Sequence, residues 1–272
     1  MTIVFQSRDL PGTGCAVVPT MGALHRGHAS LIRIARERCP DLPCVVTVFV
    51  NPTQFNERSD YERYPRDLEA DARLAREAGA EFVFAPAVDE VYPGGPAAHA
   101  LALPRVAFEP GLEDRHRPGH FAGVCQVVKR LLLLTRARSA VFGEKDWQQL
   151  QVVRALCEQD GLGTVIVPAP IVRDDDGLAL SSRNVFLTPE QRVIAAEVPR
   201  ALSVAAREQT PAAGERVLRE RLGAHSIPFD YAVARDARTL GPVTPGAPAR
   251  LLVTARVGTV RLLDNMPMRG AD

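Results

Sequence analysis

The sequence lacks several features that would assign it to a special class of protein. Its 33 basic and 32 acidic side chains nearly cancel, and a net charge of +1 disfavours a cationic nucleic-acid-binding protein and an acidic disordered chain. No uninterrupted apolar run approaches the roughly 18 residues of a membrane span, and the N-terminus has no basic start followed by an apolar core. We therefore expect a soluble, cytoplasmic globular protein that binds neither membranes nor nucleic acids.

Cysteine and lysine are both scarce in this chain of 272 residues. The five cysteines form no C-x-x-C pair and no regular spacing, which indicates buried thiols in a reducing compartment. Only two of the 33 basic residues are lysines, Lys129 and Lys145. Because the sequence uses arginine almost everywhere else, a retained lysine hints at a position that needs a compact ammonium group.

Common nucleotide-binding and hydrolytic motifs are also missing. The Gly-Thr-Gly at residues 12–14 precedes a predicted strand instead of following it, which disfavours a Rossmann dehydrogenase. The chain has neither the G-x-x-x-x-G-K-[ST] loop of a P-loop kinase nor a G-x-S-x-G elbow. His116 and His120 have the spacing of a helical zinc pair, but Pro118 and Gly119 between them disfavour a helix there.

Up to about residue 172, short β-branched runs alternate with amphipathic helical stretches. Short, mostly apolar runs are typical of strands buried on both faces of a parallel sheet. The alternation predicts a Rossmann-like α/β fold with a doubly wound parallel sheet. The predicted strands are 15–18, 44–50, 81–85, 139–142 and 164–167, and the predicted helices are 29–38, 68–78, 123–135 and 147–159.

A second segment begins after the acidic turn at residues 174–177. Helical patterns are followed there by strand patterns, which indicates a smaller C-terminal α+β domain. We therefore predict two domains, residues 1–172 and residues 173–272. The second contains predicted helices at 189–209 and 212–222 and predicted strands at 229–234, 250–254 and 259–263.

Two histidines follow the first predicted strand, at the edge where an open α/β sheet binds its ligand. His25 and His28 lie where a helix begins, and a helix N-terminus holds phosphates through its N–H groups and its dipole. Gly22 and Gly27 permit close backbone approach, and both imidazoles could donate hydrogen bonds to phosphoryl oxygens. The alternative is that His25 caps the helix and His28 packs beneath it. The two histidines and two glycines together favour the phosphate site.

Polar residues follow the other predicted strands as well. Lys145 suits β- or γ-phosphate oxygens, although it could instead be a solvated lysine paired with a neighbouring carboxylate. The Ser-Ser-Arg-Asn loop at residues 181–184 could clamp phosphates or could simply precede the next helix. Gln54 and Gln149 can donate and accept at once, which suits a ligand with carboxylate and hydroxyl groups.

Six segments of the sequence occur in the same order as the sequence motifs of one known family. They are PTMGALHRGH, FVNPTQF, YPRDLEAD, RPGHFAGV, FGEKDWQQL and DGLALSSRN. On these motifs the sequence resembles the pantothenate synthetases (pantoate–β-alanine ligases) of the nucleotidyltransferase superfamily. The resemblance implies a two-step ATP-dependent ligase, in which the carboxylate of pantoate attacks the α-phosphate of ATP and the amine of β-alanine then displaces AMP from pantoyl adenylate.

The resemblance also implies roles for individual residues. His25, His28, Lys145 and Arg183 would be catalytic, and His28 would act as a proton donor or as an electrostatic donor.

The resemblance further implies Mg²⁺ with the ATP, a homodimer, an ATP- and pantoate-binding domain at 1–172 and a lid domain at 173–272. Glu69 and Asp71 could help with the metal, but we expect them on a solvated helix face. The implied ATP contacts are Met21, Gly22, Ala23, Leu24, His25, Arg26, Gly27, His28, Gly143, Glu144, Lys145, Asp146, Val172, Leu180, Ser181, Ser182 and Arg183, and the implied substrate contacts are Asn51, Gln54 and Gln149.

Two other assignments remain open at this stage. A related nucleotidyltransferase with a phosphorylated acceptor is disfavoured, because arginines would suit such an acceptor better than Gln54 and Gln149. A catalytically silent nucleotide-binding or scaffold protein is disfavoured because both histidines, Lys145 and Arg183 are present.

Overall fold

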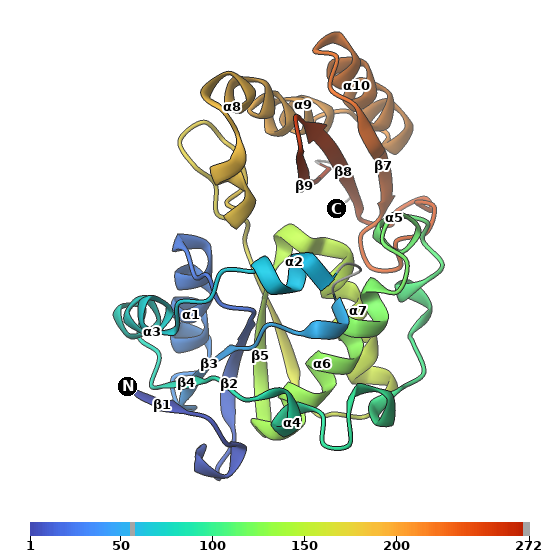
Figure 1. Cartoon of the computed structure of the whole chain (residues 1–272). Helices are drawn as coiled ribbons and strands as arrows, with labels where there is room; N and C mark the ends of the chain where they lie inside the picture. Colours follow the sequence, from blue (N-terminus) through green and yellow to red (C-terminus); the bar gives the residue numbers. More distant parts are fainter. Residues whose placement is uncertain (55–57, 269–272) are drawn as a thin grey trace. The chain divides into compact units, whose positions relative to one another are not determined.

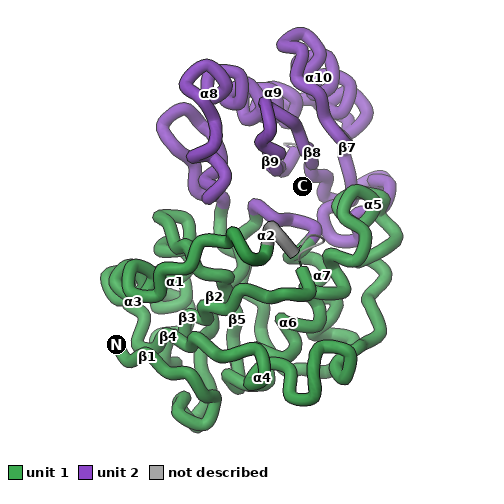
Figure 2. Tube along the Cα trace, in the orientation of Figure 1, with its two compact units in different colours: residues 1–144, 149–170 green, residues 145–148, 171–272 purple. Residues whose placement is uncertain are grey.

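The computed structural model describes residues 1–54 and 58–268, and the chain divides into two compact units (Figure 2). Unit 1 comprises Met1–Glu144 and Gln149–Pro170, and unit 2 comprises Lys145–Gln148 and Ile171–Asp272. The short segment 145–148 thus groups with the C-terminal part of the chain. The predicted functional division after residue 172 stays a prediction. Phe55, the last residue of the second motif, lies outside the described residues.

Unit 1 contains a six-stranded sheet whose strand pairs are all parallel (Figure 1). Its strand order is β1-β4-β3-β2-β5-β6, so the direction of winding reverses between β2 and β5. Ligands of open α/β sheets bind outside the carboxyl ends of the strands at such a reversal. The strands are β1 (Thr2–Val4), β2 (Cys15–Thr20), β3 (Cys44–Val48), β4 (Phe82–Phe84), β5 (Ala137–Gly143) and β6 (Val165–Ala169).

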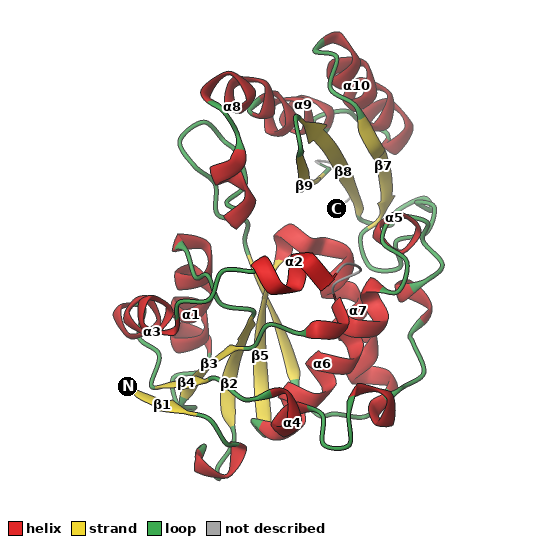
Figure 3. Ribbon diagram, viewed as in Figure 1, coloured by secondary structure: helices red, strands yellow, loops and turns green. Residues whose placement is uncertain are grey.

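Helices cover both faces of this sheet, which confirms the doubly wound architecture (Figure 3). Ile32 and Ala35 of α1 and Ala72 and Ala75 of α3 form one core with alternate residues of the strands, including Val46. The opposite face packs against α6. The longer helices of this part of the chain are α1 (Arg26–Arg38), α3 (Leu68–Glu77), α6 (His120–Leu134) and α7 (Trp147–Gln159), and the shorter ones are α2 (Arg58–Arg63), α4 (Val88–Val91) and α5 (Glu113–His116).

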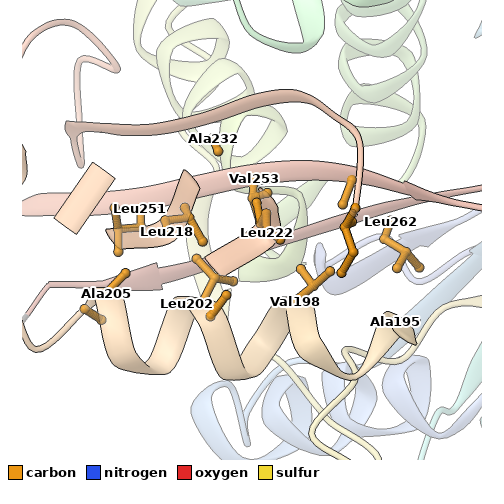
Figure 4. Packing of buried hydrophobic residues seen from close by; sticks show 14 of the residues in the cluster. Ala195, Val198, Leu202, Ala205, Leu218, Leu222, Ala232, Leu251, Val253 and Leu262 are labelled. Atoms are coloured by element: carbon orange, nitrogen blue, oxygen red, sulfur yellow. The ribbon is translucent and has the colours of Figure 1, made fainter. Parts of the chain in front are cut away.

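Unit 2 contains a three-stranded antiparallel sheet with helices packed on one face. Leu202 of α9 and Leu218 and Leu222 of α10 meet Leu251 and Val253 of the sheet in a continuous apolar core (Figure 4). The α+β prediction is therefore confirmed. The elements are α8 (Pro189–Ala195), α9 (Glu197–Ala205), α10 (Pro211–Ala224), β7 (Phe229–Asp236), β8 (Ala249–Val257) and β9 (Val260–Pro267).

The structure differs from the prediction in two places. The helix expected over 189–209 is two helices, α8 and α9, because Pro199 has no N–H to donate and its ring would clash with the carbonyl of residue 195 in one continuous helix. The strand expected to come first, at residue 15, is preceded by β1, which pairs with β4 at the edge of the sheet. Three residues are too few to show a periodic pattern, so the sequence gives no signal for β1.

The core of unit 2 gives a direct stability prediction. Leu202 is fully buried, and its replacement by alanine is expected to lower the free energy of unfolding by about 2–5 kcal/mol through lost burial and a cavity. Val193→Ala on the neighbouring helix is the control, because Val193 is 69% exposed and its loss should change the free energy by only about 0.5 kcal/mol. Urea denaturation measures both, and equal effects would contradict the packing described.

Candidate active site

Residues 21–25 link β2 to α1, and their backbone follows an unusual path. Gly22 and Ala23 have positive φ angles of 85° and 51°, in the left-handed region that favours glycine. A Cβ on Gly22 would lie 2.8 Å from the Oδ2 atom of Asp71. The N–H of Gly22 donates to the hydroxyl of Thr20 at 3.1 Å. The turn therefore requires glycine at residue 22, for its φ angle and for space.

Asp71 of α3 holds the next part of this loop. Its carboxylate accepts hydrogen bonds from the N–H groups of Leu24 at 2.7 Å and Ala23 at 3.1 Å. Asp71 is 3% exposed, and burial raises the pKa of its carboxyl, while the two N–H donors oppose that rise. Our expectation of a solvated helix face is wrong for Asp71, whereas Glu69 is exposed. The available signal was helical spacing, which puts Asp71 on the same face as buried Ala75.

The two histidines form a reciprocal cap at the N-terminus of α1. His25 is the N-cap residue, and its Nδ1 accepts a hydrogen bond from the N–H of Gly27 at 3.1 Å. The Nδ1 of His28 accepts from the N–H of His25 at 3.3 Å, and the ring centroids are 4.1 Å apart. A ring nitrogen that accepts a hydrogen bond carries no proton, so we assign the proton of each neutral imidazole to Nε2. Capping therefore uses Nδ1 of both rings, which places the proton of each neutral ring on Nε2.

The loop after β3 is built around Asn51, which is fully buried. Its amide oxygen accepts from the hydroxyl of Tyr92 at 2.9 Å, and its amide nitrogen donates to Oε1 of Gln54 at 3.2 Å and to the carbonyl of Gly123 at 3.1 Å. A Cβ on Gly123 would lie 2.5 Å from the carbonyl oxygen of Thr53, which explains the second glycine of the RPGHFAGV motif. In this structure Asn51 thus holds Gln54 in place.

The segment after β5 is tied to the sheet of unit 2. The carbonyl of Lys145 accepts from the amide nitrogen of Asn265 at 3.0 Å. The indole N–H of Trp147 donates to the carbonyl of Ala237 at 2.8 Å, and the guanidinium carbon of Arg250 lies 3.4 Å from the Trp147 ring centroid. A desolvated cation–π contact of this kind contributes about 2 kcal/mol.

The predicted phosphate loop of unit 2 is also defined by hydrogen bonds. The N–H of Leu180 donates to the carbonyl of Val172 at 2.9 Å, which pairs two of the predicted ATP-contact positions. The hydroxyl of Ser181 accepts from the N–H of Arg183 at 3.2 Å and caps the 3₁₀-helix Ser182–Phe186. Ser182 and Arg183 are exposed, and Lys145 is half-buried.

The predicted site residues are therefore divided between the two units. Within unit 1, the strand pairing of β2 with β5 places the histidine loop beside the end of β5. Unit 1 contains Met21, Gly22, Ala23, Leu24, His25, Arg26, Gly27, His28, Asn51, Gln54, Gly143, Glu144 and Gln149, and unit 2 contains Lys145, Asp146, Val172, Leu180, Ser181, Ser182 and Arg183.

Comparison with known proteins bears directly on this site. A family model described as pantoate-beta-alanine ligase matches residues 2–267. The chain belongs to this family. A pantothenate synthetase from Nocardioides sp. (strain ATCC BAA-499 / JS614) is 50% identical to it over 273 residues, which cover 94% of this chain and 79% of that protein.

Solved structures of the same family share the fold. The crystal structure of pantothenate synthetase from Thermus thermophilus is 44% identical and has a TM-score of 0.87, with 98% of this chain and 99% of that chain covered. Pantoate-beta-alanine ligase from Francisella tularensis, complexed with beta-gamma ATP and beta-alanine, is 30% identical with a TM-score of 0.78, and the match covers 98% and 97% of the two chains. The predicted family and fold are confirmed.

Within residues 1–54 and 58–268, no helix has both the length and the apolar character that a membrane crossing requires. Over the same described residues, no group of three or more His, Cys, Asp and Glu side chains is arranged to hold a metal ion.

The support of the histidine loop by Asp71 can be tested through the backbone. In Asp71→Ala, the N–H groups of Ala23 and Leu24 lose their acceptors, and we expect a loss of about 1–3 kcal/mol in the free energy of unfolding. Amide hydrogen exchange should accelerate at these two residues.

Glu69→Ala is the matched control, because it removes an exposed carboxylate from the first turn of the same helix. It should leave the exchange of Ala23 and Leu24 unchanged. Equal exchange rates in Asp71→Ala and the wild type would contradict the role of Asp71.

Proposed function

We propose that the chain joins pantoate to β-alanine through a pantoyl adenylate. Membership of the pantoate–β-alanine ligase family makes it an ATP-dependent ligase of these two substrates. In the first step the pantoate carboxylate attacks the α-phosphorus and pyrophosphate leaves. In the second, the amine of β-alanine attacks the acyl carbon, AMP leaves with the electron pair of the broken carbon–oxygen bond, and the nitrogen releases one proton to the solvent. Neither step requires a covalent bond to the enzyme, so positioning and charge stabilisation are its main tasks.

The reciprocal cap of His25 and His28 at the start of α1, which assigns an Nε2–H donor to each ring, is the observation that carries this proposal. The two rings stand at a helix N-terminus, whose dipole favours an anion, and at the point where the winding of the sheet reverses. Because main-chain hydrogen bonds fix both rings, the donors need no reorganisation when negative charge develops on a phosphoryl oxygen. We therefore assign electrostatic stabilisation, and not proton donation, to His25 and His28.

The remaining ATP contacts are proposed from the positions of the family motifs. Lys145 and Arg183 would neutralise phosphate charge, Lys145 as a compact ammonium and Arg183 as a planar fork. A lid role for residues 173–272 is proposed from the family resemblance. The proposed ATP set is Met21, Gly22, Ala23, Leu24, His25, Arg26, Gly27, His28, Gly143, Glu144, Lys145, Asp146, Val172, Leu180, Ser181, Ser182 and Arg183.

The substrate side of the proposal rests on neutral amides. Gln54 and Gln149 would hydrogen-bond the hydroxyl and carboxylate groups of pantoate, with Gln54 also near β-alanine. Asn51 supports this by holding the amide of Gln54 at 3.2 Å. Amides donate and accept without a charge, so they can bind a hydroxy acid without competing for the phosphates.

Three further points are proposals as well. Magnesium would accompany ATP and be held mainly by phosphate oxygens and water, which suits a site where Asp71 serves the backbone of the histidine loop. We also propose a homodimer, as the family resemblance implies, and a cytoplasmic location, which suits the free cysteines of the chain.

The central assay is formation of AMP from ATP in the presence of both pantoate and β-alanine. We expect no turnover if either acid is omitted, while pantoate alone should support exchange of pyrophosphate into ATP. Exchange that depends on another acceptor would indicate a different nucleotidyltransferase. A chain that binds ATP and lacks all exchange would contradict the proposed function.

The role of the histidines is tested by two substitutions at one position. Glutamine at the third helical position can accept the N–H of His25, as in a capping box, and can donate an N–H to phosphate. His28→Gln should therefore retain more pantoate-dependent exchange than His28→Ala, which we expect to lose about 100-fold or more. Equal losses in both variants would instead favour proton transfer by the imidazole.

A further inference from the structure

We propose that Asn265 is a positioning residue for Lys145 and that Arg250 orients its amide for this purpose. The inference rests on the proposed role of Lys145 at the phosphates. Asn265 lies on β9, far along the chain from Lys145, yet its amide nitrogen donates to the Lys145 carbonyl at 3.0 Å. Asn265 is 2% exposed, so this hydrogen bond is protected from water.

The orientation of the Asn265 amide is fixed by its second partner. Its oxygen accepts from the guanidinium of Arg250, so its nitrogen must face the carbonyl of Lys145. Arg250 pairs with Pro267 in the β8–β9 ladder, and Asn265 is the diagonal neighbour on the same face of the sheet. This is the face opposite the one on which Leu251 packs with the helices.

Arg250 also holds the segment two residues beyond Lys145. Its guanidinium lies over the ring of Trp147, and the indole N–H of Trp147 donates to the carbonyl of Ala237. The backbone of residues 145–147 is therefore fixed at its beginning by Asn265 and at its end by Trp147. The side chain of Lys145 therefore starts from a fixed backbone position. This matters because its ammonium group is proposed to bind a phosphate oxygen.

The residue next to Asn265 links the same strand to the second phosphate-binding segment. The carboxylate of Asp264 accepts two hydrogen bonds from Arg173, at 2.7 and 2.9 Å. Arg173 follows Val172, whose carbonyl receives the N–H of Leu180. Two neighbouring residues of β9 therefore hold the segments that carry Lys145 and Arg183. One strand thus positions the backbone near both cations.

Asn265→Asp tests the proposal most sharply. The variant keeps an oxygen for Arg250 but replaces the donor with an oxygen that repels the Lys145 carbonyl. We expect kcat for pantoate-dependent exchange to fall by about 10- to 100-fold, as for a misplacement of about 1 Å, with a raised KM for ATP. The KM for β-alanine, measured in the complete ligation reaction, should be unchanged. Arg250→Lys, which keeps the charge but not the planar fork, is the second variant and should act in the same direction.

The scarcity of lysine provides a readout that does not depend on turnover. The chain has two lysines, so acylation by a succinimidyl ester followed by peptide mapping reports Lys145 separately, with Lys129, which is 2.8 Å from Asp160, as the internal reference. ATP should slow acylation of Lys145 and leave Lys129 unchanged. In Asn265→Asp, the ATP concentration for half-protection should rise at least tenfold.

Asp230→Asn is the control for a general loss of stability, because it weakens the 2.7 Å ion pair with Arg261 in the same sheet. It should lower the melting temperature without changing the protection of Lys145. Wild-type protection in both Asn265→Asp and Arg250→Lys would overturn the proposal. Unprotected Lys145 in the wild type would overturn it too, even where exchange proceeds. Protection without exchange would contradict only the proposed function.

Discussion

The first turn of α1 is the constraint on which the rest of the site depends, because the two imidazoles that cap the helix there are also the proposed phosphate donors. Each has two nitrogens, and the main chain occupies the same one in both rings. Helix formation therefore decides which nitrogen carries the proton and where it points. In the proposed function, a phosphate would meet donors already in place, together with the positive end of the helix dipole.

Around this turn, the family motifs divide into groups proposed to touch ligands and groups that hold them. Asp71 supports the histidine loop, Gly123 lets a helix approach the carbonyl of Thr53, and Asn51 fixes Gln54. Asn265 does the same for Lys145. These residues are explained by the backbone or side chain that each of them positions.

The sequence predicted the sheet and the order of its motifs well, because strands buried on both faces must be apolar and the loops after them collect polar residues. It misjudged Asp71, since a carboxylate in a charged helix looks solvated until the partner loop is known. It could not reveal the contacts of Arg250 and Asn265 with residues 145–147, because no local periodicity links positions so far apart. The tautomers of His25 and His28 could not be predicted from the sequence either, because they depend on the hydrogen-bond partners of each ring.

The most direct measurement of the central claim is the tautomeric state of His25 and His28. Long-range proton–nitrogen NMR correlation on protein with nitrogen-15 histidine identifies the protonated nitrogen of each ring, and substitution assigns the signals of the six histidines. We predict that both rings carry the proton on Nε2 in the free protein and that both Nε2–H signals shift when ATP binds. A neutral ring with its proton on Nδ1, or Nε2–H signals unmoved by bound ATP, would contradict the account.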